Sequence, residues 1–167
     1  KSFASRKKMS KKVHRLFLTR GVPGTHDTKL LINTFKKIYK KKFKPVLIPK
    51  FDKSIDDRFP KKKWACVKKR PNIVIFEGWC VGSKPEKNIQ LIKPINLLEK
   101  FEDSKLTWRK KVNNELKSNY KKIFELIDKL IFLKVPSFKY VFKWRLLQEK
   151  KLKTKSKGKK IMSEFQI

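Results

Sequence analysis

The chain has 167 residues, of which 39% are hydrophobic and 37% are charged, and its formal net charge is +33. This length and apolar content allow one domain with a hydrophobic core and are unlike those of a disordered protein. The two cysteines do not form a disulfide framework or a metal-binding spacing, and no apolar run is long enough to span a membrane, so we expect a cytoplasmic protein without a membrane partner.

The excess of positive charge raises the alternative of a basic protein that associates with nucleic acid and has no catalytic activity. However, 7 of the 47 basic residues are arginines, and the lysines are spread along the whole chain. Because specific recognition of bases and phosphates favours arginine, this pattern indicates a lysine-rich surface rather than a specific nucleic-acid site. We expect weak, salt-sensitive adhesion to polyanions in either case.

The first half of the chain contains a loop between two predicted helices. Residues 5–17 favour a short basic helix, and the sequence "FLTRGVPGTHDTKLL" (17–31) follows it. Two glycines and a proline within four positions of this segment set backbone angles that regular elements avoid, so they predict a shaped loop. The apolar spacing after the loop predicts a helix over 27–40. Next, "KPVLIPKFD" is typical of a short strand and "DKSIDDRFPKKKW" of a charged loop.

Two unbroken apolar runs in the second half favour buried strands of a parallel sheet. One is residues 72–78, within "RPNIVIFEGW", and the other is "DKLIFLKVP". Between them, the apolar spacing from Leu106 to Ile127 predicts a helix, and residues 138–155 predict a basic amphipathic helix. The alternation of strands and helices indicates an α/β fold with a mostly parallel sheet. The final segment, "GKKIMSEFQI", resembles the start of another helix.

Two groups of polar side chains in the first half are candidates for substrate binding. The loop 17–31 carries Arg20, His26 and Asp27, a combination that a turn does not need but a polar site uses. The segment "PKFDKSIDDRF" is the densest acidic cluster in a chain with 14 acids, and it adds Asp52, Lys53 and Arg58. The alternatives are a solvated charged face, or a salt bridge that shapes the loop.

The second half offers candidates for phosphate chemistry. Glu77 would stand at the carboxyl end of a predicted strand, where ligands of parallel sheets bind, and could hold Mg²⁺ or act beside a phosphate. Arg145 and Gln148 are three residues apart on a predicted helix, where an arginine could clamp a phosphoryl group. An ordinary strand end and a solvent-facing helix are the alternatives. The aromatic residues, Tyr120 among them, are predicted to be core, and the sequence contains no G-x-x-x-x-G-K-[ST] loop, nucleophilic triad or zinc spacing.

Six segments occur in the order seen in the D-glycerate 3-kinase-like branch of the P-loop kinases: "TRGVPGTHD", "PKFDKSIDDR", "VIFEGWCVG", "PINLLE", "WRKKVNNELKSNY" and "PSFKYVFKWRLLQE". The resemblance runs from about Met9 to Leu152, and the short "DKSIDDR" form is similar to bacterial members of this branch, which is related to uridine kinase and phosphoribulokinase. It implies a three-layer P-loop fold, a parallel sheet with flanking helices. It also implies ATP and Mg²⁺ as cofactors, and phosphoryl transfer to a hydroxyl of a small metabolite, with glycerate suggested by the family name.

The resemblance also implies roles for the candidate residues. Glu77 would be the strand-end acid near Mg²⁺ and the γ-phosphate. The acceptor substrate would be bound by the loop 17–31 together with the cluster that follows, which gives Arg20, His26, Asp27, Asp52, Lys53 and Arg58. Arg145 and Gln148 would lie on a lid helix, residues 138–155, that closes over the nucleotide.

One departure from the family pattern concerns the extent of the chain. In the family, the phosphate-binding loop and the first strand lie upstream of all six segments, and further helices follow them. We therefore expect residues 1–167 to be one partial P-loop kinase domain that lacks the phosphate-binding loop and the C-terminal end, and that is catalytically inactive alone.

Overall fold

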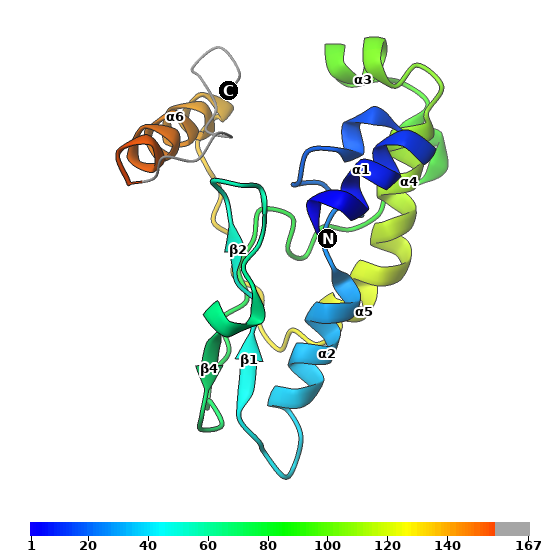
Figure 1. Ribbon diagram of the computed structural model, residues 1–167. Helices are drawn as coiled ribbons and strands as arrows, with labels where there is room; N and C mark the ends of the chain where they lie inside the picture. The colour runs from blue at the N-terminus through cyan, green and yellow to red at the C-terminus, as the bar shows by residue number, and fades with distance from the viewer. Residues whose placement is uncertain (156–167) are drawn as a thin grey trace.

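The computed structural model describes residues 1–155, and its ribbon is shown in Figure 1. Helices predominate, and the strands are short. In chain order the elements are α1 (Phe3–Lys12), a 3₁₀ turn (Arg15–Phe17), α2 (Thr28–Ile38), β1 (Val46–Ile48), β2 (Phe51–Asp52), β3 (Asp57–Arg58), a 3₁₀ turn (Lys61–Lys63), β4 (Ala65–Val67), a 3₁₀ turn (Asn88–Leu91), α3 (Leu97–Glu102), α4 (Thr107–Glu115), a π-helical turn (Leu116–Tyr120), α5 (Lys121–Phe124) and α6 (Phe138–Lys155).

The helix predicted over 27–40 is confirmed as α2. It begins where Oδ1 of Asp27 accepts a hydrogen bond from the backbone N–H of Leu30, at 3.1 Å, which is the usual role of an aspartate in the N-cap position. Its apolar face buries Phe35 and Ile38 on the side of β1, where Val46 is also buried. The predicted basic helix at 5–17 is present as α1 and the 3₁₀ turn that follows it.

The strands form two antiparallel pairs rather than one parallel sheet. β1 pairs with β4, with Leu47 opposite Cys66, and β2 pairs with β3, with Phe51 opposite Arg58. The expected mixture of helices and strands is confirmed, but the described residues contain no parallel sheet. The physical reason is the connections: β2 and β3 are joined by a four-residue turn, and so short a link permits only an antiparallel pair.

The two apolar runs predicted as buried strands were interpreted wrongly. Residues 72–78 and the run 128–136 form no strand, and Ile75 and Leu133 expose 88% and 84% of their surface. A strand needs a neighbour for its backbone hydrogen bonds, and none within residues 1–155 pairs with either run. The first run instead packs by one side chain, since the ring of Phe76 meets the ring of Phe35 edge-on at 5.5 Å.

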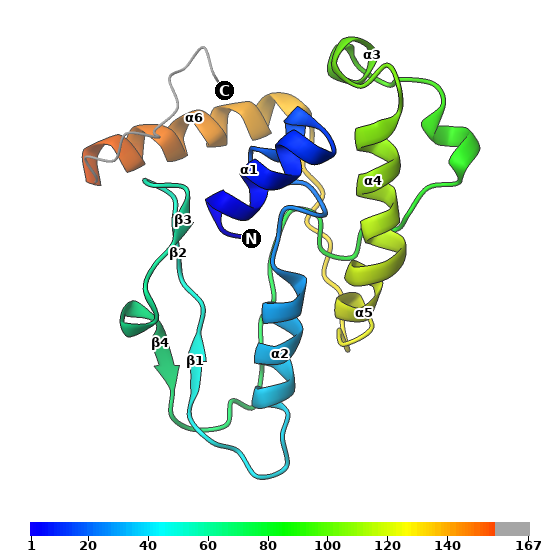
Figure 2. The ribbon, with the colours of Figure 1, turned by 45° about the vertical axis from the view of Figure 1, so that its right-hand side comes forward.

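The helix predicted from Leu106 onward is confirmed as α4, the π-helical turn and α5. α4 begins at Thr107, and the buried carboxylate of Asp103, four residues earlier, accepts hydrogen bonds from the backbone N–H groups of Trp108 and Arg109 in its first turn, at 2.8 and 2.9 Å. Figure 2 shows the three segments as one continuous helical rod with α2 beside α5. The most deeply buried apolar residues, Phe17 and Ile123, come from the turn before α2 and from this rod, and Tyr120 is buried with them, as predicted.

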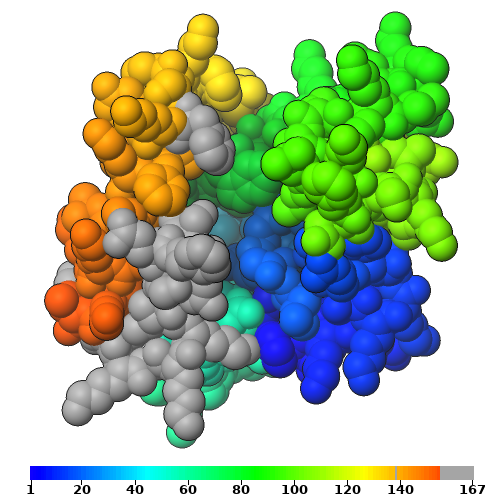
Figure 3. Space-filling view, turned by 90° about the horizontal axis from the view of Figure 1, so that it is seen from above, coloured from blue at the N-terminus to red at the C-terminus, as the bar shows by residue number. Residues whose placement is uncertain are grey.

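The peripheral helices complete the fold. Figure 3 shows α1 abutting the region of α3 and α4, and Nε2 of His14 lies 2.9 Å from the carbonyl oxygen of Glu102. The helix predicted at 138–155 is confirmed as α6, which lies on the side of the molecule opposite α4. The segment "GKKIMSEFQI" lies outside the described residues. No helix within residues 1–155 is both long and apolar enough to cross a membrane.

Candidate functional site

The centre of the candidate site is a rigid turn, residues 20–27, which we call the glycine turn. The Oγ1 of Thr25 accepts a hydrogen bond from the N–H of Gly21 at 3.0 Å and donates one to the carbonyl of Val22 at 2.7 Å. Gly24 has a φ of +99°, and a Cβ there would lie 3.2 Å from Cγ of Glu115. Glycine is therefore favoured at this position by its backbone angle and by the close approach of Glu115, the last residue of α4.

Asp27 and Arg58 meet across the site, although 31 positions separate them in the sequence. Oδ2 of Asp27 lies 3.0 Å from Nη1 of Arg58, while its Oδ1 caps α2. Each side chain is about one-third exposed. The carboxylate of Asp27 is thus engaged by the cap and the ion pair, whereas Arg58 keeps further N–H groups that could bind an anion.

Two further arginines contact the hairpin of β2 and β3. The guanidinium carbon of Arg20 lies 4.1 Å from the centre of the Phe51 ring, a cation–π contact. Arg6, on α1, is fully buried, and its Nη1 donates to Oδ2 of Asp56 and to the carbonyl of Leu18, both at 3.0 Å. Sequence reasoning missed Arg6, because it stands among lysines in a helix and belongs to no motif.

The side chains of His26, in the glycine turn, and Tyr120, in the helical rod, are in close polar contact. Nδ1 of His26 lies 2.5 Å from Oη of Tyr120, which also accepts a hydrogen bond from the N–H of Gly24 at 3.2 Å. Burial, together with the nearby cations of Arg20 and Lys1, lowers the pKa of His26 to about 4. Burial raises the pKa of Tyr120 well above its ordinary value. Both side chains are therefore uncharged at neutral pH.

The remaining acceptor-side candidates lie in the turn between β2 and β3. Oδ1 of Asp52 accepts hydrogen bonds from the N–H and Oγ of Ser54, at 2.9 and 2.6 Å, and the bond from the Ser54 side chain lowers the pKa of Asp52. Lys53 is exposed in the same turn. The structure thus gives Asp52 a turn-shaping contact, which is one of the alternatives left open by its sequence.

The structure brings the end of the 72–78 segment to the glycine turn, whereas the candidate residues of α6 bond to each other. Nε1 of Trp79 donates to the carbonyl of Gly21 at 3.1 Å, and Glu77, two residues earlier, is exposed. On α6, Nη1 of Arg145 lies 2.5 Å from Oε1 of Gln148, and Nη2 of Arg145 forms a 2.6 Å ion pair with Glu149. Sequence reasoning did not identify Trp79 as a contact of this turn.

The described residues do not form a complete metal site by themselves. Within residues 1–155 no group of three or more His, Cys, Asp or Glu side chains is arranged to hold a metal ion, so Glu77 belongs to no such group. Arg145 and Gln148, the candidates for binding the nucleotide, bond to each other on α6.

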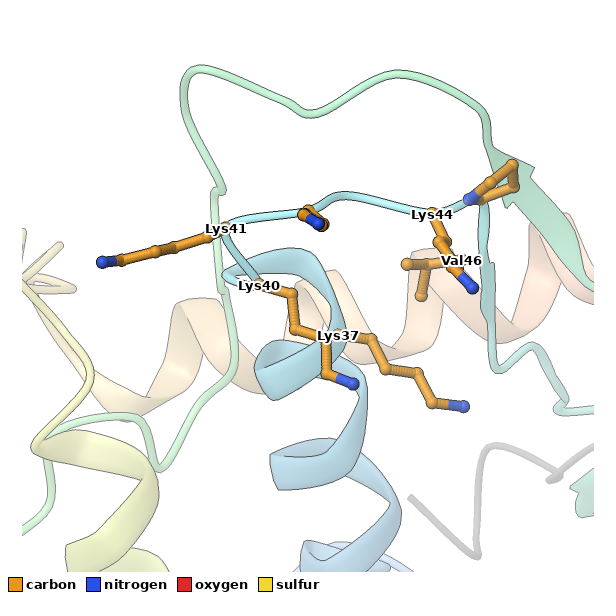
Figure 4. A pocket seen from close by; sticks show the side chains of 7 residues that line it. Lys37, Lys40, Lys41, Lys44 and Val46 are labelled. Carbon is orange, nitrogen blue, oxygen red and sulfur yellow. The ribbon is translucent and has the colours of Figure 1, made fainter.

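A separate hollow of about 570 Å³ lies between the end of α2 and β1 and is lined mainly by lysines. Its lining residues are Lys37, Lys40, Lys41, Lys42, Lys44, Pro45 and Val46. Figure 4 shows that the lysine side chains diverge, with Lys41 extending away from Lys37 and Lys44. The hollow can attract a polyanion through its charge, but its cations do not converge on one point as they do in a site for a small anion.

Comparison with known proteins relates the chain to kinases. It is 35% identical over 142 residues to the uncharacterized kinase mug58 of Schizosaccharomyces pombe, and the aligned region covers 81% of this chain and 50% of that protein. It is 33% identical over 161 residues to the probable ATP-dependent kinase TDA10 of Saccharomyces cerevisiae, 86% of this chain and 50% of that protein. It is 30% identical over 136 residues to the chloroplastic D-glycerate 3-kinase of Arabidopsis thaliana, 78% of this chain and 27% of that protein.

These matches relate the chain to part of each kinase and not to its whole length. It spans half or less of the length of each of these three relatives. No protein-family model matches it. The predicted resemblance to kinases is confirmed at this level, while the assignment to a bacterial-type member stays a prediction. Over about four-fifths of its length, the chain is therefore a homologue of proteins named as kinases, one of them a D-glycerate 3-kinase.

Proposed function

We propose that the chain forms the acceptor-binding part of a kinase that transfers a phosphoryl group from ATP to a hydroxyl of a small acidic metabolite, with D-glycerate as the specific candidate. The observation that carries this proposal is the 30–35% identity to three kinases, of which one is a D-glycerate 3-kinase and another is named as ATP-dependent. In this proposal the complete domain has a P-loop-type α/β fold.

The charges around the glycine turn favour an acidic acceptor. Arg20 and Arg58 carry positive charge at the turn, and His26 is uncharged. The one acid of the turn, Asp27, is engaged by Arg58 and by the cap of α2. A carboxylate entering this region would be attracted by the two guanidinium groups, and its hydroxyl would be oriented by the rigid backbone. Positioning of this kind is the main contribution that a protein makes to phosphoryl transfer.

The nucleotide side of the site rests on resemblance and not on the geometry of the described residues. We keep Glu77 as a proposed Mg²⁺ ligand, and Arg145 and Gln148 as proposed nucleotide-binding residues of a lid helix. We also place the phosphate-binding loop in the part of the kinase that this chain does not span, because the two fungal relatives are about twice as long as the matched region. ATP would supply the transferred phosphoryl group, and the glycine turn would hold and orient the acceptor.

The test is an assay of the native gene product with all of its natural flanking sequence. It would be incubated with ATP and Mg²⁺ and with each of D-glycerate, glyceramide and uridine, and the products would be identified by ³¹P NMR. We expect phosphorylation of D-glycerate, and little of glyceramide, which lacks the carboxylate. Failure to phosphorylate any of the three would overturn the proposal.

The 167-residue chain provides a second measurement. We expect it to bind D-glycerate in isothermal titration calorimetry without turning over ATP, because it would carry the acceptor side alone. The variant Arg58→Gln should weaken this binding, whereas Lys134→Gln, on an exposed segment, is the matched control for loss of one positive charge. Rapid ATP turnover by the 167-residue chain would contradict the division between acceptor and nucleotide sides.

A second candidate function, association with nucleic acid without catalysis, rests on the lysine-lined hollow and on the net charge of +33. Binding through lysines alone releases counterions from the phosphate backbone, so its affinity should fall steeply with salt and should not depend on ATP. Titration of a single-stranded oligonucleotide between 50 mM and 300 mM salt distinguishes this function from the first. Tight binding at 50 mM salt that falls steeply as the salt rises and does not depend on ATP would favour association with nucleic acid.

A further inference from the structure

Tyr120 joins the glycine turn to the helical rod by a contact that neither the sequence motifs nor the relatives assign. It is the last residue of the π-helical turn, a distortion that frequently marks functional positions in helices. Its side chain is 4% exposed, and its ring packs edge-on against His26 and Phe124. Its Oη reaches two groups of the glycine turn, the N–H of Gly24 and Nδ1 of His26.

The hydrogen-bond requirements of these atoms determine where the protons lie. The backbone N–H of Gly24 can only donate, so Oη of Tyr120 accepts from it. The phenol retains its own proton and needs an acceptor, since its O–H is buried with the ring. Nδ1 of His26, at 2.5 Å, is the acceptor within reach. The neutral imidazole then carries its one proton on Nε2.

The other ring nitrogen of His26 is available to a ligand. Within residues 1–155, Nε2 makes no hydrogen bond. The buried polar atoms without a partner in this part of the chain are Nε of Arg6 and Nε1 of Trp108, so Nε2 of His26 is accessible to solvent. The cations of Arg20 and Lys1 lie near the same ring, and they disfavour a positive charge on it. The group presented by His26 is therefore an uncharged N–H donor in a positively charged neighbourhood, which suits an anionic oxygen.

We propose that Tyr120 is a positioning residue that holds His26 in the Nε2–H tautomer, so that His26 donates a hydrogen bond to a carboxylate oxygen of the acceptor. The anionic acceptor rests on the proposed function, whereas the tautomer follows from the described contacts alone. In this tautomer Nε2 has no lone pair to accept a proton, and Nδ1 is occupied by Tyr120. His26 then binds the acceptor and does not serve as the base that deprotonates its hydroxyl.

The first experiment is ¹H–¹⁵N correlation NMR of the 167-residue chain with ¹⁵N-labelled histidine at pH 6.5. The chain contains two histidines, and the variant His14→Gln assigns the signals of His26. We expect an unprotonated-type ¹⁵N shift at Nδ1 and a protonated-type shift at Nε2. A proton on Nδ1 in the wild-type spectrum would overturn the positioning role directly, whether or not any variant folds.

The second experiment removes one atom from the contact. In Tyr120→Phe the tautomer preference should be lost, and the two ¹⁵N shifts of His26 should move towards each other, while Tyr39→Phe, at an exposed tyrosine, should leave them unchanged. D-glycerate binding should weaken about tenfold in Tyr120→Phe, as expected for the disruption of one hydrogen bond to a charged group. In the native gene product this loss should fall on KM more than on kcat.

Titration with D-glycerate separates the two proposals. A change of the Nε2 shift on addition of D-glycerate, with no change on addition of glyceramide, supports the carboxylate contact. The expected tautomer without any response of Nε2 to D-glycerate would overturn the carboxylate contact and count against the proposed acceptor. A normal response to D-glycerate together with an unchanged tautomer in Tyr120→Phe would overturn the role of Tyr120 while the proposed function stands.

Discussion

The buried, uncharged state of His26 predicts a specific loss of stability in acid. The folded chain holds the pKa of His26 at about 4, whereas in the unfolded chain it returns to the ordinary value of 6.5. Between these values the unfolded state binds more protons than the folded state, so stability rises with pH and is lost as pH falls from 6.5 towards 4. At about 1.4 kcal/mol per pH unit, and allowing for the partial exposure of the ring, the loss between pH 7 and pH 4.5 is about 2 kcal/mol.

The measurement is urea unfolding of the wild-type chain and of His26→Gln at pH 7 and at pH 4.5, followed by circular dichroism. Carboxylates also titrate in this range, but they do so in both proteins, so the difference between the two stability changes isolates His26. The wild type should lose about 2 kcal/mol more than His26→Gln between the two pH values. His14→Gln, measured in parallel, gives the contribution of the other histidine. Equal losses in wild type and His26→Gln would refute the reasoning that burial keeps this imidazole neutral.

Three further predictions concern contacts that hold the site together. Asparagine tolerates the left-handed φ of 54° at position 56, so Asp56→Asn removes only the charge that faces the buried Arg6. The free energy of unfolding should fall by about 2–4 kcal/mol, and an unchanged urea midpoint would contradict this. Asp27→Ala should cost about 1–2 kcal/mol because it removes both the cap of α2 and the ion pair with Arg58, whereas Asp27→Asn, which keeps the cap, should cost less than about 1 kcal/mol; identical losses in urea unfolding would show that the cap contributes nothing. Gly24→Ala should lower stability by about 1–3 kcal/mol in thermal unfolding because of its positive φ, while Gly21→Ala, where a Cβ would meet nothing within 4 Å, is the matched control and should be nearly neutral.

The elements that the sequence predicted well are those whose signal is local. The periodicity of α2, of the α4–α5 rod and of α6 is set by side chains three or four positions apart, and each of these helices is present. The strands depend on partners elsewhere in the chain. An apolar run such as 72–78 indicates a segment that could be buried on both faces, but it carries no information on whether a neighbouring strand is there to bury it.

The candidate site divides in the same way. The glycine turn and its residues Arg20, His26 and Asp27 are evident from adjacent letters of the sequence. The pairing of Asp27 with Arg58 is not, because nothing in either segment marks the other. Tyr120 shows what a spacing pattern does not predict. Helical spacing correctly placed its ring in the core, but the same spacing would fit a phenylalanine, and it does not indicate that the hydroxyl contacts His26, 94 residues away in the sequence.

The contact between His26 and Tyr120 closes a loop of 94 residues, and this has a consequence for the order of folding. The entropy lost on closing a loop grows with its length, so contacts between neighbours in the sequence form before those that join distant segments. During synthesis, α1, the glycine turn and α2 emerge well before the π-helical turn exists to receive them. The glycine turn thus gains its contact with Tyr120 late on the folding pathway, and a substitution in α4 or α5 that slows the formation of the rod should delay this contact more than the appearance of helical structure.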